Sequence, residues 1–233
     1  MEAQFEALSE LVKNGQKLNF GQDFFVKFYQ AFLYSDRWRQ YIKGVGTTLL
    51  VTAIALVLGV VLGAIVAMVR VGYAQQKPHH RNPILGIFNA VAQVYVTVIR
   101  GTPMMVQLLI MSMVIFASSR NFTMVGALAL GINSGAYVSE IIRGGLMAVD
   151  PGQMEAGRSL GLNYMTTMFE IIIPQAIRSI LPALGNEFIM LLKDSSLITV
   201  IGGKELLYAA QGIMNRTYEP MFPLLGVAAT YLV

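Results

Sequence analysis

The sequence lacks cysteine altogether and carries little charge. Without a single Cys among 233 residues, the chain can form neither a disulfide framework nor a thiolate metal site. Its two histidines are the adjacent pair His79 and His80, so a His-rich metal site is not expected either. Charged residues make up only 13% of the chain, about half the share of a typical soluble domain. A soluble fold needs charge to cover its surface, and the low charge therefore excludes a globular enzyme of the cytosol.

Other functions are disfavoured by motifs that are missing. The formal net charge of +4 is too small and too scattered to indicate nucleic-acid binding. The sequence has no GxxxxGK[ST] phosphate-binding loop, so any nucleotide must be bound by another chain. Ser195 and Ser196 follow Lys193 in the manner of a nucleophile–base pair, but no second catalytic signal accompanies them. A charge pair of Lys193 and Asp194 at a helix end is the simpler interpretation, and no cofactor or metal is expected on this chain.

Long apolar stretches fill most of the sequence. Hydrophobic residues make up 55% of the chain, and its mean hydropathy is +0.58. An uncharged run of residues 44–69 is long enough to cross a bilayer core of roughly 30 Å as a tilted helix. We expect an all-α, polytopic membrane protein with about five transmembrane helices, at residues 44–69, 103–118 (after a lead-in helix at 84–99), 124–149, 171–192 and 220–233. The last run is still apolar at Val233 and short for a span, so we expect its helix to continue further.

Glycine and proline mark the points where these helices pack closely or break. Gly59 and Gly63 form a small-xxx-small pair, which favours close helix packing, although a helix can also tolerate glycine without such a contact. Pro103 interrupts the apolar run because proline lacks a backbone donor and disfavours helix in the residue before it. Pro174 interrupts the fourth span in the same way.

The first 43 residues are the only stretch of soluble character. We expect them to form an N-terminal amphipathic segment, with residues 44–233 as the transmembrane domain. Phe24, Phe28 and Phe32 have the i, i+4 spacing of one helical stripe. This stripe predicts an interfacial helix lying along membrane lipid before the first span. The alternative is a helix that packs on the rest of the protein.

A polar segment between the third and fourth spans carries the start and stop signals of a short helix. Asp150 can cap its N-terminus, Pro151 suits the first helical position, and Gln153 is placed to complete a capping box. Gly161 suits the left-handed position after a helix, and Asn163 can cap a second helix. A polar turn would be enough to join two spans, and a helix this short is marginal alone in water. The independently capped helix therefore indicates that something docks on it.

The same segment resembles a known family. Residues 155–174, EAGRSLGLNYMTTMFEIIIP, resemble the EAA motif of ABC transporter permeases, in which Glu-Ala-Ala, three residues, Gly and nine residues precede Ile-x-Leu-Pro. Gly157 replaces the third Ala of this pattern and Ile173 replaces Leu, both small or isosteric changes. Three further stretches resemble the polar amino-acid uptake branch, of histidine, glutamine and arginine type: RGTPMMVQ (100–107), INSGAYVSEIIRGG (132–145) and NEFIMLLKDSSL (186–197). The resemblance covers roughly residues 44–233 with its spacing intact.

This resemblance implies a type I ABC importer permease (MetI-like) architecture and a subunit that is not itself an enzyme. The helix at about 150–162 would be the coupling helix, which docks on a cytoplasmic ATPase through Met154, Glu155, Ala156, Gly157, Arg158, Leu160 and Gly161. The residues alone leave open that Glu155 and Arg158 merely form a solvated face. The implied partners are an ATPase homodimer that binds ATP and Mg²⁺, a second permease copy or a sister permease, an extracellular or periplasmic solute-binding protein and an amino-acid substrate. The implied location is the bacterial cytoplasmic (inner) membrane, in a multi-pass arrangement.

Polar residues within the spans are the second group of candidates. Charges at bilayer depth are costly and usually face a cavity or a partner. A zwitterionic amino acid needs a carboxylate for its ammonium and donors or a cation for its own carboxylate. We therefore expect the substrate pathway to include Thr102, Gln107, Ser134, Tyr137, Glu140, Asn186 and Glu187. The alternative is structural: Arg143 pairs with Glu140 three residues away, and Asn186 or Glu187 bridges two spans.

The predicted orientation in the membrane disagrees with the distribution of positive charge, and the predicted function has one alternative. A cytoplasmic coupling helix and five spans place the link 70–83 inside and the N-terminal segment outside, whereas the distribution of Lys and Arg does not support this orientation. A stand-alone secondary transporter or channel is the alternative function, with the spans broken at Pro103 and Pro174 lining its site. Such a protein would need neither an ATPase nor a docking helix.

Overall fold

The computed structural model describes residues 1–76 and 82–232, and every regular element within these ranges is a helix. The predicted polar link falls partly on residues 77–81, so His79 and His80 lie outside the described residues. The elements are α1 (Glu2–Lys13), α2 (Phe20–Phe32), the 3₁₀ turn η1 (Tyr34–Asp36), α3 (Trp38–Ala74), α4 (Pro83–Gly101), α5 (Met104–Ile110), the π-helix η3 (Met111–Ile115), α6 (Phe122–Met147), α7 (Pro151–Ser159), α8 (Tyr164–Thr167), the π-helix η4 (Met168–Ile172), α9 (Ile173–Asp194), the 3₁₀-helix η5 (Ser195–Ile201), α10 (Leu206–Thr217) and α11 (Met221–Leu232). The all-α prediction is confirmed.

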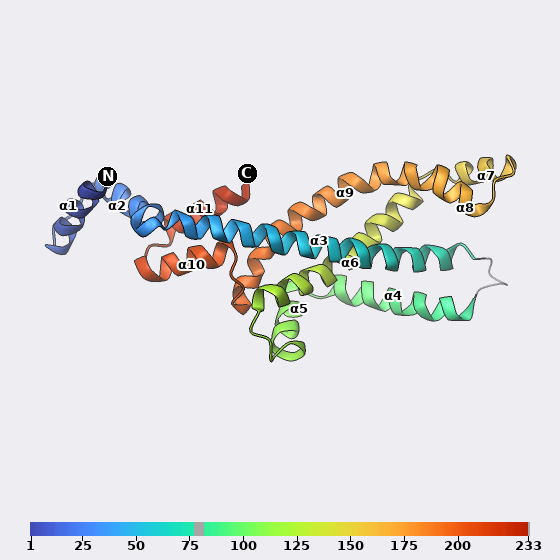
Figure 1. Ribbon diagram of the computed structural model, residues 1–233, viewed down its shortest axis with the longest axis horizontal. Helices are drawn as coiled ribbons and strands as arrows, with labels where there is room; N and C mark the ends of the chain where they lie inside the picture. Colours follow the sequence, from blue (N-terminus) through green and yellow to red (C-terminus); the bar gives the residue numbers. More distant parts are fainter. Residues whose placement is uncertain (77–81, 233) are drawn as a thin grey trace.

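The molecule is elongated, and its two ends carry different elements (Figure 1). Helices α3, α4, α6 and α9 run along the long axis. Helix α7 lies at one end, together with the C-terminal end of α3 and the N-terminal end of α4, whereas α1, α2 and α10 lie towards the other end (Figure 1). The two helix ends that flank the predicted link thus lie at the same end as α7 and away from α1 and α2, whereas the membrane side that each end faces stays a prediction.

Within residues 1–76 and 82–232, four helical stretches are long and apolar enough to cross a membrane. They are Tyr34–Ala74, Pro83–Gly101, Phe122–Met147 and Tyr164–Ile201, and two shorter apolar helices cover Met104–Ile115 and Met221–Leu232. The prediction of a lead-in helix at 84–99 followed by a span at 103–118 was therefore wrong about which segment is long enough to cross the membrane: it is the one before the break. The 19 residues of α4 reach about 28 Å at the helical rise per residue, whereas extended backbone at Thr102 and Pro103 leaves only a short helix after the break.

Helices α3 and α6 form the most extensive pair in the structure. Their backbones approach so closely at Gly59 and Gly63 that a methyl group there would not fit. A Cβ on Gly59 would lie 2.7 Å from the hydroxyl oxygen of Ser134, and one on Gly63 would lie 2.7 Å from Cβ of Val138. The small-xxx-small pair is thus a helix contact face and not merely tolerated glycine.

The interior is apolar where α3, α5, α6, α9 and η5 meet. Val51, Leu108, Leu130, Leu191 and Ile198 are all buried in this cluster. By contrast, large apolar side chains on the outward faces are exposed, as expected of helices that face lipid: on α3 these include Leu50, Val57, Val61 and Ile65. The exposed apolar surface therefore supports a location within a membrane.

Helix α2 packs on the last helix of the chain. The rings of Phe24 and Phe28 meet Phe222 of α11 edge to face, at centroid distances of 4.9 and 6.1 Å. Lys27 lies 3.6 Å from the carboxylate of Glu219. Part of the predicted aromatic stripe therefore contacts the rest of the protein, as the alternative interpretation proposed. Phe20 is 84% exposed, and the interfacial placement of α2 stays a prediction.

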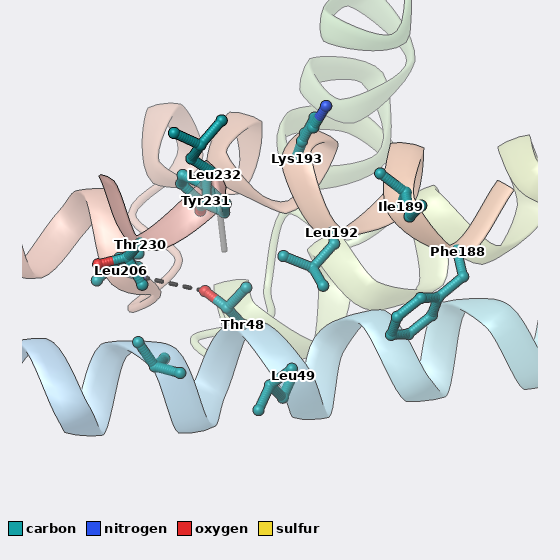
Figure 2. Close-up of a pocket in the computed structure, with 11 residues that line it drawn as sticks. Thr48, Leu49, Phe188, Ile189, Leu192, Lys193, Leu206, Thr230, Tyr231 and Leu232 are labelled. Atoms are coloured by element: carbon teal, nitrogen blue, oxygen red, sulfur yellow. Dashed lines mark hydrogen bonds between the residues drawn. The ribbon is translucent and has the colours of Figure 1, made fainter. Parts of the chain in front are cut away.

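An apolar cavity of about 440 Å³ lies between α3, α9, α10 and α11 (Figure 2). The hydroxyl of Thr48 on α3 accepts a hydrogen bond of 3.3 Å from the backbone N–H of Leu206, which ties α10 to α3 beside the cavity (Figure 2). The other side chains that line it are Val45, Leu49, Phe188, Ile189, Leu192, Lys193, Thr230, Tyr231 and Leu232.

A buried carboxylate holds the same end together. Glu205 is 1% exposed, and its side chain caps α10 by accepting from the backbone N–H groups of Leu207 and Tyr208, at 2.8 and 2.7 Å. The hydroxyls of Thr199 and Tyr231 also donate to this carboxylate. One side chain thus joins η5, α10 and α11.

Candidate functional site

The short helix α7 begins and ends as its sequence predicts. A carboxylate oxygen of Asp150 accepts the backbone N–H of Gly152 at 2.7 Å, and Pro151 occupies the first turn. The helix ends before Gly161, whose φ of +85° lies in the left-handed region. The predicted capping box does not form. The side-chain oxygen of Gln153 instead accepts a hydrogen bond of 3.2 Å from Gln175 on α9, because α9 passes within reach.

At Gly157, the backbone of α7 packs closely on a side chain of the segment that follows it. Gly157 is buried, and a Cβ there would lie 2.5 Å from Cγ2 of Thr167, which is fully buried at the end of α8. The side chain of Asn163 caps α8 by accepting the N–H of Thr166 at 2.8 Å, as predicted. Helix α7 is therefore packed directly on α8 and the π-helix η4, which continue into α9.

The opposite face of α7 is exposed. Of the residues assigned to docking, Gly157 faces inward and Met154 is partly covered, whereas the others are exposed on α7 or just after it: Glu155, Ala156, Arg158, Leu160 and Gly161. Leu160 is 82% exposed, an unusual position for a leucine at the polar end of a membrane protein. The structure therefore holds a rigid helix in place and leaves its outer face free.

The α7 end is also linked to the first long helix. The hydroxyl of Tyr164, at the start of α8, donates a hydrogen bond to the side chain of Gln75, which follows α3. These residues are 89 positions apart, so no local sequence signal indicated the contact. The α7 end is thus connected to two long helices, to α9 through the chain and to α3 through this side-chain contact.

Further along the molecule, one carboxylate is shared among arginines of three helices. Glu140 on α6 accepts hydrogen bonds from Arg70 on α3 and from Arg143 on its own helix, the latter at 2.7 Å. Arg100 at the end of α4 has its guanidinium 3.9 Å from the same carboxylate. Sequence reasoning paired Glu140 with Arg143 but missed Arg70 and Arg100. In the sequence, Arg70 closes one apolar run and Arg100 interrupts the next, and these positions were the signal that could have indicated both residues.

A second polar group bridges α4, α5, α6 and α9. The side-chain amide of Gln107 donates to the hydroxyl of Thr102 at 2.8 Å and accepts from Asn133 at 2.9 Å. The hydroxyl of Ser134 donates to Glu187 at 2.7 Å, although Glu187 is 53 residues away and only 6% exposed. These contacts cross between spans and support the structural alternative for Glu187, that it bridges two spans.

Two adjoining cavities bring most of the predicted pathway residues together. The larger, of about 380 Å³, is lined by Arg100, Tyr137, Glu140, Ile141, Ala183, Asn186, Glu187 and Met190. The smaller, of about 80 Å³, is lined by Thr102, Met104, Asn133, Tyr137, Glu187, Met190, Leu191 and Asp194. Tyr137 and Glu187 belong to both cavities, whereas Gln107 and Ser134 lie behind the walls and hold their neighbours by hydrogen bonds.

Comparison of the sequence with known proteins identifies its family and its relatives. Residues 83–233 match the family described as binding-protein-dependent transport system inner membrane component. The chain is 37% identical over 216 residues to a putative glutamine transport system permease protein of Rickettsia typhi, and the match covers 90% of each chain.

Solved structures show the same relationship. One described as an amino acid ABC transporter with histidines is similar with a TM-score of 0.74 and 42% identity, covering 83% of this chain and 86% of its own. An inward-facing methionine ABC transporter shares the fold, with a TM-score of 0.68 at 17% identity and coverage of 86% and 93%. The fold is thus one that ABC transporters use.

Proposed function

The chain belongs to the family of binding-protein-dependent transport system inner membrane components, and from this premise we propose that it carries polar amino acids inward at the expense of ATP hydrolysed by a separate subunit. It is a multi-pass protein of the inner membrane and a permease component of an ABC transporter, a non-catalytic subunit. The substrate class rests on the relatives, which include a putative glutamine permease and an amino acid ABC transporter.

The observation that carries the proposal is the capped, outward-facing helix α7. A nine-residue helix is marginal in water, and this one is held by Asp150 at its start and by packing at Gly157. Its free face offers a carboxylate at Glu155 and a guanidinium at Arg158, which suit a partner groove of mixed charge. We assign this face to an ATPase subunit, with Met154, Ala156, Leu160 and Gly161 completing the contact.

The remaining partners follow from the same proposal. Since the sequence has no phosphate-binding loop, ATP and Mg²⁺ bind to the ATPase pair. The pathway lies between this chain and a second copy or a sister permease, and a solute-binding protein delivers the substrate on the side opposite α7.

The contacts suggest how a push on α7 reaches the pathway. Helix α7 is packed on α8 and η4 at Gly157, and η4 continues into α9, which carries Asn186 and Glu187 into the larger cavity. Closure of the ATPase pair would thus move one wall of the cavity against the wall formed by α6. Access to the substrate would then alternate between the two membrane sides, with the cavity near the point of rotation.

The test is ATP-driven uptake in proteoliposomes that hold this chain with its ATPase, with ATP inside and the binding protein outside. Glu155→Lys reverses the charge on the free face of α7, and we expect loss of uptake of a radiolabelled amino-acid panel. Glu170→Lys is the matched control, because Glu170 is also exposed near this end but lies on η4. Uptake that needs no ATP would instead favour a stand-alone secondary transporter, and ATP-driven uptake that survives Glu155→Lys would overturn the docking role given to this face of α7.

A further inference from the structure

The larger cavity is lined by a cation that is not hydrogen-bonded to the carboxylate of Glu140. Arg100 lies at the end of α4, and its side chain is 42% exposed beside the cavity. Its guanidinium lies 5.2 Å from the centroid of the Tyr137 ring, a cation–π distance that holds the group over the ring face. Arg100 is the one cation among the described residues that line this cavity.

The neighbouring carboxylate is already occupied. Glu140 is bonded by Arg70 and Arg143, so its single negative charge faces two guanidiniums before Arg100 is counted. Arg100 stays 3.9 Å away, beyond hydrogen-bond distance. The four side chains together carry a surplus of positive charge, and Arg100 is the cationic member that lines the cavity. Glu140 is therefore poorly placed to receive the ammonium of a substrate, contrary to its predicted role.

A carboxylate that can accept further hydrogen bonds lies in the wall formed by α9. Glu187 accepts one hydrogen bond, from Ser134 to its Oε1, within the described part of the chain. It lines both cavities, next to the amide of Asn186 in the larger one. The cavity thus presents a guanidinium from α4 and a carboxylate from α9, an arrangement complementary to the two charges of an α-amino acid.

We infer that Arg100 binds the α-carboxylate of the substrate over the ring of Tyr137, while Glu187 receives its ammonium group. This assignment rests on the proposed function and adds to it the residue that recognises the carboxylate. A guanidinium can bind a carboxylate through two parallel hydrogen bonds, whereas an ammonium offers a single point of charge. A substrate of this site must therefore have a free carboxylate, and the site would discriminate against the corresponding amine.

The test compares Arg100→Gln and Arg100→Lys with the wild-type complex of permease and ATPase in proteoliposomes. The probes are tritiated L-glutamine and L-arginine, supplied with saturating binding protein, and ATP hydrolysis is measured in the same vesicles. We expect Arg100→Gln to lower the maximal uptake rate at least tenfold while ATP hydrolysis stimulated by the binding protein persists. Arg100→Lys should retain an intermediate rate, because it keeps the charge without the planar pair of donors.

The control and the outcomes separate this inference from the proposed function. Arg178→Gln removes an exposed guanidinium of α9 that does not line the cavity, and its uptake should match the wild type. Wild-type uptake in Arg100→Gln would overturn the assignment and leave the importer intact. A fall in ATP hydrolysis equal to the fall in uptake would also overturn it, because Arg100 would then serve the assembly of the complex. No ATP-driven uptake of either probe by the wild type would overturn both proposals.

Discussion

Adding one methyl group at Gly157 should weaken the transmission of force from α7. A Cβ at this position would lie 2.5 Å from Cγ2 of Thr167 and 2.9 Å from its hydroxyl oxygen. To reach an ordinary contact distance of 3.4 Å, the two helices must part by about 0.9 Å. Overpacking of this kind typically costs about 1–3 kcal/mol, which corresponds to about 5- to 150-fold in an equilibrium between two positions of α7.

The assay is the ratio of amino acid taken up to ATP hydrolysed, measured in proteoliposomes with the ATPase. We expect Gly157→Ala to lower this ratio, because the clash with Thr167 displaces α7 from its packing on α8 and η4. Thr167→Ala removes both crowding atoms and costs one hydrogen bond, from the Thr167 hydroxyl to Asn163. The double variant should therefore recover part of the ratio that Gly157→Ala loses. A wild-type ratio in Gly157→Ala, or equal losses in the single and double variants, would refute the reasoning.

Two further predictions concern stability, measured as the melting temperature of the detergent-solubilised complex by size exclusion after heating. Gly63→Ala should lower the melting temperature, because the new methyl would lie 2.9 Å from the backbone nitrogen of Ser139 as well as against Val138. The expected loss of folding free energy is about 1–3 kcal/mol. Gly72→Ala on the same helix is the control and should be neutral or stabilising, since nothing lies within 4 Å of its Cβ position. Glu205→Gln should destabilise by about 1–3 kcal/mol, because an amide donor would face groups that donate to the buried carboxylate; an unchanged melting temperature would count against the role given to it.

Local signals predicted the features that depend on neighbours in the sequence. Asp150, Pro151 and Gly161 define the ends of α7 because capping and left-handed backbone depend on residues only a few positions apart. Gln153 shows the limit of such signals, since the same side chain had a second partner on α9 that only the folded chain supplies. The lengths of the apolar runs likewise predicted the helices but not which segment of the run broken at Pro103 forms the longer helix.

Contacts between distant residues were beyond the reach of the sequence. Arg70 and Glu140 are 70 positions apart, and a charge at the end of an apolar run is equally typical of a boundary at the membrane surface. The ring of Tyr137 under Arg100 has no signature at all in the order of residues. Pairing across helices follows from their packing, which the glycines at positions 59 and 63 indicate only in outline.

The length of α3 has a mechanical consequence. Its 37 residues reach about 55 Å, well beyond a bilayer core of roughly 30 Å. One end lies near Gln75, which is bonded to Tyr164, and the other end adjoins α10 and α11. A stiff rod of this length acts as a lever, so a tilt of only 10° about one end would carry the other sideways by about 10 Å. Small motions beneath the membrane would thus be amplified at its far surface without any further moving part.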